Sequence, residues 1–236
     1  MKFDTEKYKD KKILILGGGT STLDAKWENL DYDYLWTCND FYLEPRVLNT
    51  DIDLYLLAYN VDLKHPDLLS KLQDSNTQVV LEPLHYRGKQ YSQSFKEFSQ
   101  SIGIPVYAMD LFNVTKDVSS AGYSGAMFRL IGTALLLQAK QVMFAGFDGF
   151  NEQFTNIHAF TKHPGLKPTD TRRTFRGDKR AYYEVFTQAY EYFTKLPNYD
   201  RLQNLGEGFD YNIGTPVSRE YFPLHPEIKK LIHETD

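Results

Sequence analysis

Short runs of apolar residues alternate along this chain with segments in which apolar residues recur every three or four positions. Continuous Val, Ile and Leu runs are typical of buried parallel strands, and the three-to-four-residue recurrence is typical of helices. The pattern predicts strands at residues 13–16, 34–37, 54–58, 78–81, 106–109 and 142–145. Because strands and helices alternate, we expect an α/β fold, with a Rossmann-like, mainly parallel sheet flanked by helices.

Helices are predicted between and after the strands, near residues 20–23, after Pro66, over about 93–101 with an end at Gly103, over 124–139 and over 178–196. The 124–139 segment has the clearest periodicity and is apolar on most sides. This pattern predicts a helix held between the sheet and a second layer. From residue 200 onward we expect irregular chain, apart from a short helix after Pro226.

Residues 150–180 interrupt the periodic pattern. Between Asn151 and Gly177, the residues Pro, Gly, Thr, His, Lys and Arg replace the regular spacing of apolar side chains. Loops of this length inside a compact domain are uncommon and often cover a binding site. We therefore expect residues 1–236 to form a single α/β domain with a small lid or loop subregion at 150–180.

The strongest local signal is the run ILILGGGTS, in which a buried strand leads into three glycines and two hydroxyls. Glycine lets bare backbone approach a ligand, and Thr20 or Ser21 can cap a helix whose first N–H groups point at an anion. The dinucleotide fingerprint is met at Gly17 and Gly19, but Thr22 stands at its third glycine. No Lys precedes the hydroxyls as a P-loop requires. We expect a phosphate or diphosphate site of another kind.

Polar residues follow other predicted strands: Asn39 and Asp40 the second, Asn60 the third and Asp148 the last. The carboxyl ends of parallel strands share one edge, where α/β sheets bind ligands. A side-chain amide both donates and accepts, which suits a nucleotide base, a ribose or a sugar hydroxyl. The alternative is that each Asn merely closes a turn.

A second anion site is predicted at the start of the long helix. Ser124 can cap that helix, and its N-terminal dipole then faces a phosphate or sugar next to Gly125. A plain helix cap is the alternative, and the two roles are compatible.

The chain has 27 basic and 31 acidic residues, a net charge of −4, which argues against general nucleic-acid binding. Its single cysteine, Cys38, excludes an internal disulfide and a multi-cysteine zinc site, as suits a reducing cytosol. We expect no membrane span, and the N-terminal residues are too charged for a signal peptide. A cytoplasmic protein is expected, with peripheral membrane contact and oligomeric state left open.

Four motif-bearing segments follow one another over roughly residues 12–150: ILILGGGTSTL, DYDYLWTCNDFYLE, LYLLAYN and GYSGAMFRLIGTALLLQAKQVMFAGFDGF. This pattern resembles the bacterial lipooligosaccharide sialyltransferases, which have a G-N-G-P-S loop, an R-C-N-Q-F-Y segment, a Y-N pair, a T-S-G helix start and a strand ending in G-I-D-F-Y. Motility-accessory glycosyltransferases and hydroxymethylpterin diphosphokinases share the first and last features. The C-N-D-F-Y segment favours the sialyltransferase-like branch.

The resemblance implies a glycosyltransferase that moves sialic acid or a related nonulosonate from a CMP-sugar to a glycan hydroxyl, with no required metal or other cofactor. It implies that the domain binds the donor through the strand ends and the start of the long helix. The residues expected there are Gly17, Gly18, Gly19, Thr20, Ser21, Asn39, Asp40, Asn60, Ser124, Gly125 and Asp148.

The chain departs from this family where catalysis takes place. In that family tyrosines hold the leaving phosphate; here Phe150 stands in place of the first, and Phe154 or Ile157 lies near the second. No His lies at the family's general-base position near Gly177 and Asp178. His158 and His163 lie upstream as alternative bases, since a neutral imidazole can accept a proton from a sugar hydroxyl. The Asp178 carboxylate is a third candidate, and a surface position is the alternative for each His.

Basic residues in the lid can hold the leaving phosphate in place of the missing tyrosines. Arg172, Arg173 and Arg176 can clamp a departing phosphate, because guanidinium groups bind phosphate oxygens through paired donors. A solvated charge run is the alternative. Such arginines would also suit a nucleoside diphosphate donor.

The string Asp51-Ile52-Asp53 matches the D-x-D motif with which some glycosyltransferases bind a metal. Those motifs follow an apolar strand, whereas this one precedes the strand predicted at 54–58. Asp148 does follow a strand but has no acidic partner within two residues. We therefore expect no required metal.

Two other functions stay open. One is an ATP-dependent diphosphokinase of the hydroxymethylpterin type, which would need magnesium. The other is a nucleotide-binding relative without catalysis, which the substituted tyrosines and the displaced His suggest.

Overall fold

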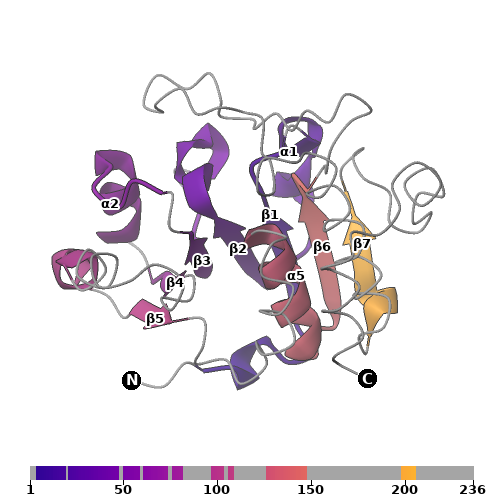
Figure 1. Cartoon of the computed structure of the whole chain (residues 1–236). Coiled ribbons are helices and arrows are strands. Elements are labelled where there is room, and N and C mark those ends of the chain that lie inside the picture. The colour runs from indigo at the N-terminus through magenta and orange to yellow at the C-terminus, as the bar shows by residue number, and fades with distance from the viewer. Residues whose placement is uncertain are drawn as a thin grey trace, which may run out of the picture.

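The computed structural model describes residues 4–19, 21–47, 50–58, 61–73, 76–81, 97–103, 106–108, 126–147 and 198–205. Within these residues seven strands form one sheet in the order β5-β4-β3-β2-β1-β6-β7, and each neighbouring pair is parallel. The strands are β1 (Lys12–Leu16), β2 (Tyr34–Cys38), β3 (Leu54–Leu57), β4 (Gln78–Leu81), β5 (Val106–Ala108), β6 (Gln141–Ala145) and β7 (Leu202–Asn204). This sheet confirms the predicted α/β, Rossmann-like fold (Figure 1).

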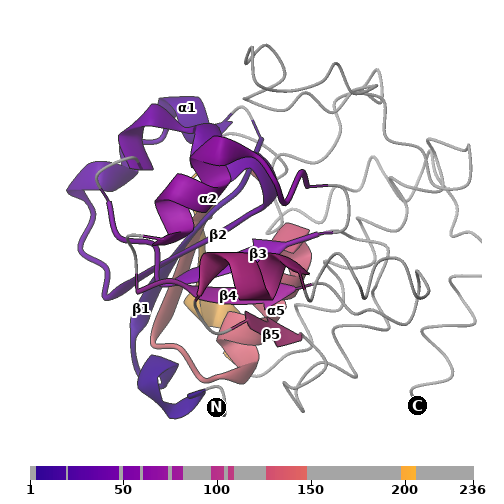
Figure 2. The ribbon, with the colours of Figure 1, turned by 90° about the vertical axis from the view of Figure 1, so that its left-hand side faces the viewer.

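The described helices are α1 (Ser21–Asp24), α2 (Pro66–Gln73) and α5 (Ala126–Leu136), together with a helical segment at residues 97–102. Short 3₁₀ helices lie at Glu6–Tyr8, Trp27–Asn29, Asn39–Leu43, Pro45–Val47 and Tyr199–Arg201. Figure 2 shows α1 and α2 on one side of the sheet and α5 on the other. No helix in these described ranges combines the length and the apolar content that crossing a membrane requires.

Each face of the sheet carries its own apolar core, because successive residues of a strand point to opposite faces. Ile13 and Ile15 of β1 pack on the side of α5, whereas Leu14 and Leu16 pack on the side of α2. All residues of α5 from Ala126 to Leu135 are buried. The prediction of a helix enclosed on most sides is therefore confirmed.

The carboxyl end of α5 comes earlier than the sequence pattern predicts. The helix ends at Leu136 because Gln138 adopts a left-handed φ of 60° and the Ala139 N–H bonds to Ala134 O at 3.1 Å. This hydrogen bond across the helix end is that of a Schellman cap, which stops a helix although the apolar spacing continues.

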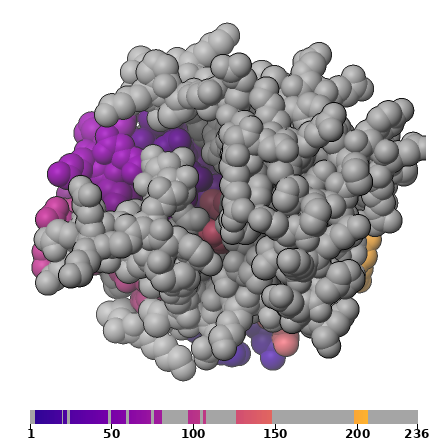
Figure 3. All heavy atoms as spheres, in the orientation of Figure 1, coloured from indigo at the N-terminus to yellow at the C-terminus, as the bar shows by residue number. Residues whose placement is uncertain are grey.

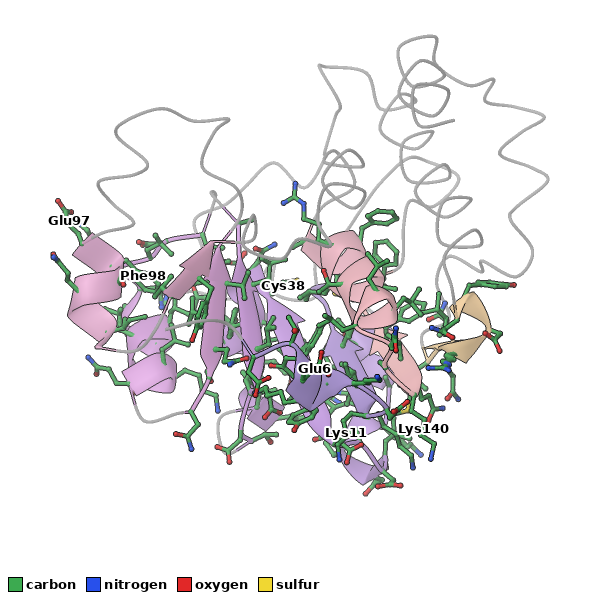
Figure 4. All side chains as sticks on the ribbon, turned by 90° about the horizontal axis from the view of Figure 1, so that it is seen from below. Glu6, Lys11, Cys38, Glu97, Phe98 and Lys140 are labelled. Carbon is green, nitrogen blue, oxygen red and sulfur yellow. The ribbon has the colours of Figure 1, made fainter. Side chains whose placement is uncertain are left out.

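The segment at 97–102 ends as predicted at Gly103, which has a φ of 66°. Phe98 is buried and belongs to the core on the α2 side, while Glu97 is exposed at the outer surface (Figure 4). One face of this short helix therefore closes the core beside β4 and β5.

The prediction of irregular chain after residue 200 is wrong at β7. Leu202, Gln203 and Asn204 pair in parallel with Val142, Met143 and Phe144 of β6. An edge strand of three mostly polar residues has neither an apolar run nor a clear alternation, so its pairing is set by the backbone of β6. In the space-filling view its residues reach the surface at the right-hand edge of the molecule (Figure 3).

The order of strands reverses at β1. The chain moves outward from β1 through β2, β3, β4 and β5, and then β6 returns to pair with the other side of β1. In open parallel sheets, the loops after the two strands at such a reversal turn toward opposite faces of the sheet. Ligands bind between these two loops, at the carboxyl ends of the strands. The fold therefore points to the ends of β1 and β6 as the place to look for a site.

Candidate functional site at the ends of β1 and β6

The loops that follow β1 and β6 are joined by backbone hydrogen bonds. Gly17 N–H donates to Ala145 O at 2.9 Å, and Gly19 N–H donates to Gly146 O at 3.0 Å. Both donors lie beyond Leu16, the last paired residue of β1. The glycine loop is thus held against the end of β6 and does not project freely from the sheet.

Two hydroxyls at the start of α1 complete this connection. Gly146 N–H donates to Ser21 Oγ at 3.0 Å, and Thr22 Oγ1 donates to Gly17 O at 2.8 Å. The Ser21 oxygen thus accepts a bond within the fold, and its contact with the nucleotide-sugar donor stays a prediction. Because α1 spans only four residues, it also lacks the aligned peptides that a helix needs to attract an anion strongly.

Thr22 stands where the dinucleotide fingerprint has its third glycine. Its buried hydroxyl bonds to the carbonyl of the first glycine, so helix and strand approach closely through a hydrogen bond. The sequence signal for this arrangement is the hydroxyl residue five positions after Gly17. In a comparison with the dinucleotide fingerprint, that residue counts only as a mismatch.

Two glycines at this site are required by packing. A Cβ on Gly146, which has a φ of 75°, would lie 2.1 Å from Thr22 Oγ1 and 2.3 Å from Gly17 O. A Cβ on Gly17 would lie 2.6 Å from Sδ of Met127, in the first turn of α5, and 2.7 Å from Gly146 O. The contact with Met127 was not foreseen, and it places the start of α5 directly against the loop.

Gly18 differs from its neighbours. Gly17 and Gly19 are buried and use their N–H groups within the fold, whereas Gly18 is partly exposed. Among the described residues, its N–H has no hydrogen-bond partner. A backbone N–H without a protein acceptor, on a partly exposed residue of a loop braced on both sides, is suited to donate to an anion.

Asn39 follows β2 at the same edge of the sheet. Its Oδ1 accepts the Ala58 N–H at 2.9 Å and so closes the end of β3, as the turn interpretation predicts. Its backbone oxygen accepts the Tyr55 hydroxyl at 2.7 Å. Asn39 adopts a φ of 54°, a conformation that Asn tolerates better than most residues. A contact between the Asn39 Nδ2 group and the nucleotide-sugar donor stays a prediction.

The Tyr55 hydroxyl supports the Asn39 turn. Tyr55 is fully buried, and burial raises the pKa of its hydroxyl well above the ordinary value. The hydroxyl also accepts the Tyr42 N–H at 2.7 Å, so it links both ends of the turn. Asp40 is partly exposed beside this turn, and its contact with the donor stays a prediction.

Several predicted site residues lie outside the described ranges, and so does the expected lid at 150–180. They are the donor-binding candidates Thr20, Asn60, Ser124, Gly125 and Asp148 and the catalytic candidates His158, His163, Arg172, Arg173, Arg176 and Asp178. The strands that precede Asn60 and Asp148, β3 and β6, end at the same edge as the glycine loop.

The D-x-D string lies at the amino ends of the strands, opposite the glycine loop. Asp53 precedes β3, donates its N–H to Leu35 O at 2.8 Å and accepts the Leu35 N–H on Oδ2 at 2.9 Å. Within the described ranges, His, Cys, Asp and Glu side chains form no group of three that could hold a metal ion. Asp53 therefore serves strand pairing at the amino ends, far along the strands from Gly18.

No family model matches the chain, and no curated protein matches it either. Among solved structures, it is similar to the sialyltransferase CstII from Campylobacter jejuni in complex with the substrate analogue cytidine-5′-monophosphate. The two chains are 16% identical, the match covers 92% of this chain and 85% of that one, and the TM-score is 0.48. The function of this chain therefore has to be inferred from its own residues.

Proposed function

We propose that the chain is a glycosyltransferase that transfers sialic acid or a related nonulosonate from a CMP-sugar donor to a glycan hydroxyl. The observation that carries the proposal is the braced glycine loop at the strand-order reversal, with the Gly18 N–H left without a partner among the described residues. A phosphate at the ends of β1 and β6 would give that N–H an acceptor.

The residues around this edge support a nucleotide-sugar as the ligand. Asn39 Oδ1 is used within the fold, which leaves the two N–H groups of its amide to donate to a cytosine, a ribose or a sugar. The C-N-D-F-Y segment that contains it is also the segment whose resemblance favours a sialyltransferase-like enzyme.

The proposed reaction is a displacement at the anomeric carbon of the donor sugar. The acceptor hydroxyl loses its proton to a general base, its oxygen bonds to the anomeric carbon, and CMP leaves with the bonding electron pair on its phosphate. His158 is the first candidate for the base, with His163 and Asp178 as alternatives. Arg172, Arg173 and Arg176 would stabilise the charge that develops on the leaving phosphate, without a required metal.

Ligand-dependent stabilisation separates this proposal from a diphosphokinase. A ligand at about 100 times its dissociation constant stabilises the folded state by roughly 2.7 kcal/mol. We expect CMP to raise the melting temperature in the presence of EDTA. A shift with ATP and magnesium, and none with CMP, would favour the diphosphokinase instead.

A direct assay then tests catalysis. The purified chain is incubated with CMP-sialic acid, with and without a panel of oligosaccharides that differ in their terminal sugar, and release of CMP is measured. We expect release that increases with acceptor and persists in EDTA. A chain that binds CMP but releases none from the donor would be the nucleotide-binding relative without catalysis.

A further inference from the structure

Arg46 lies on the α1 side of the sheet, outside the residues assigned to the site so far. Its Nη2 donates to Thr22 O at 2.6 Å, and its Nη1 donates to Ala25 O at 3.1 Å. These carbonyls belong to the single turn of α1 and to the residue just after it. One guanidinium thus occupies two acceptors that a helix end otherwise leaves open.

Charges and an aromatic ring fix the guanidinium in this position. Arg46 Nε donates to Glu44 Oε1 at 2.9 Å, and the Glu44 side chain is only 4% exposed. A second carboxylate, Glu28, lies 3.1 Å from Nη1 at the more exposed side. The guanidinium carbon lies 5.1 Å from the centre of the Trp27 ring. The planar Arg fork can satisfy all these partners at once, which a Lys ammonium cannot.

The contacts continue from α1 to the glycine loop. Thr22, whose carbonyl Arg46 binds, donates its hydroxyl to Gly17 O at 2.8 Å. Ser21, the preceding residue of the same turn, accepts the Gly146 N–H at 3.0 Å. A turn of four residues has little stability of its own, so its position depends on the groups that hold it.

We propose that Arg46 is a positioning residue of the nucleotide site. By binding the carbonyls of Thr22 and Ala25 it fixes α1, and α1 in turn holds the glycine loop and the end of β6 so that the Gly18 N–H faces the ligand. The part of this inference that concerns nucleotide binding rests on the proposed function, whereas the part that concerns loop geometry does not.

The test uses Arg46→Lys, which keeps a positive charge near Glu44 but loses the forked contacts to α1. Glu28→Gln is the matched control, because it removes the negative charge of the exposed partner of Arg46 and leaves the carbonyl contacts in place. Thr22→Val breaks the next link, the bond to Gly17 O, without changing Arg46 or Glu44. For each variant, amide hydrogen exchange is measured by NMR and CMP affinity by calorimetry.

We expect Arg46→Lys and Thr22→Val to speed exchange at the Gly19 and Gly146 amides by about tenfold or more relative to the amides of β3, because each loses hydrogen bonds that hold the loop. We expect CMP affinity to fall by a similar factor in both, and Glu28→Gln to match the wild type. Exchange that is unchanged in Arg46→Lys, or that rises equally in β3, would overturn the proposal.

Faster exchange at the loop with unchanged CMP affinity would also overturn it, because the positions of Gly19 and Gly146 would then not matter for the ligand. If the wild-type chain binds no CMP, the proposed function fails, and the exchange comparison alone decides whether Arg46 positions the loop. The two failures are therefore distinguishable.

Discussion

Adjacent glycines in the first loop have different roles. Gly17 is enclosed by Met127 and by the end of β6, whereas Gly18 is partly exposed and its N–H has no partner among the described residues. We expect Gly18→Val to lower CMP affinity by about tenfold or more, since a branched side chain keeps the phosphate from the backbone. Calorimetric titration measures the affinity, and the unfolding midpoint in urea shows whether the fold is intact. A folded Gly18→Val protein with wild-type affinity would remove this loop from the site.

Gly17→Ala is the matched control for that variant. Its new Cβ would lie 2.6 Å from Met127 Sδ and 2.7 Å from Gly146 O. Overpacking of this kind typically costs about 1–3 kcal/mol. We therefore expect Gly17→Ala to lower the free energy of unfolding, and Gly18→Val to change it much less. Equal stability losses in the two variants would contradict the distinction.

Asn39 combines a structural oxygen with an amide nitrogen that is predicted to bind the donor. Asn39→Asp keeps an acceptor for the Ala58 N–H and tolerates the left-handed φ of 54°, so we expect near wild-type stability. It loses the N–H donors, and CMP affinity should fall by a factor that corresponds to roughly 1–3 kcal/mol. Isothermal titration of Asn39→Asp and of the wild type with CMP measures this difference in affinity.

Asn39→Ala serves as the comparison, because it removes both functions and adds backbone strain. It should lose stability as well as affinity. If Asn39→Asp binds CMP as tightly as the wild type, Asn39 only shapes the turn. The corresponding experiment on Asn60 tests the other predicted amide.

Sequence reasoning located these residues but could not assign their bonds. The run from Ile13 to Ser21 has the composition of a strand and an anion-binding loop, and the loop does lie at the end of β1. Which hydroxyl faces a ligand depends on the partner loop after β6, more than a hundred residues away. The Ser21 bond to Gly146 therefore could not be inferred from local spacing.

At the scale of elements, Asp53 connects the amino ends of β2 and β3 and gives the fold a pH dependence. Burial raises the pKa of this carboxyl above its ordinary 3.8, although the Leu35 N–H and Lys7 oppose the shift. In the range just above 3.8 the folded state then binds more protons than the unfolded state. The contribution of this group to stability therefore rises as pH falls through that range and declines as pH rises.

Asp53→Asn keeps an acceptor for the Leu35 N–H and removes the charge. We expect it to be at least as stable as the wild type at neutral pH and to lose this part of the pH dependence. Asp53→Ala leaves that N–H unsatisfied and should cost about 1–3 kcal/mol. Urea unfolding at several pH values decides the matter, and a wild type that gains stability with rising pH relative to Asp53→Asn would contradict the assignment.

Elements with a strong apolar pattern were predictable, and elements defined by their partners were not. The core of α5 and the six strands with Val, Ile, Leu or aromatic runs follow from side-chain spacing. The end of α5 at Leu136 depends on backbone hydrogen bonds that spacing does not encode. β7 has no apolar run, and its pairing depends on the backbone that the edge of β6 offers.

Considering the whole molecule, the predicted lid would bring catalytic groups to the binding edge. If Arg172, Arg173 or Arg176 stabilises the leaving phosphate, its replacement by Ala should lower kcat more than it raises KM, because the interaction strengthens as charge develops. Steady-state kinetics with one CMP-sugar donor test this. A variant whose KM alone changes would assign that arginine to ground-state binding.

His158→Ala should behave differently from the arginine variants. Loss of a general base typically lowers the rate on the order of 10²–10⁴-fold, and the remaining rate should rise with pH as hydroxide or a deprotonated acceptor takes over. Rates over a pH series measure this. A wild-type rate at every pH would exclude His158 and leave His163 or Asp178 as the base to examine next.

The general architecture followed from the alternation of strands and helices, but the strand order did not. Sequence alone placed the glycine loop after the strand at 13–16 and Asp148 after the strand at 142–145, without showing that these strands are neighbours. The reversal of order at β1 depends on long-range pairing, which local periodicity cannot report. That pairing is what brings the glycine loop and Gly146 together at one site.

The most direct test of the account is to map where CMP binds, residue by residue, in the unmodified chain. We expect a titration followed by amide NMR to shift the Gly18, Gly19 and Gly146 signals most, while Lys11 and Lys140 stay unchanged. These two lysines lie together at the amino ends of β1 and β6, opposite the glycine loop, where the Lys140 N–H donates to Lys11 O at 2.8 Å (Figure 4). Saturating CMP that leaves the three glycine amides unperturbed would contradict the proposed site.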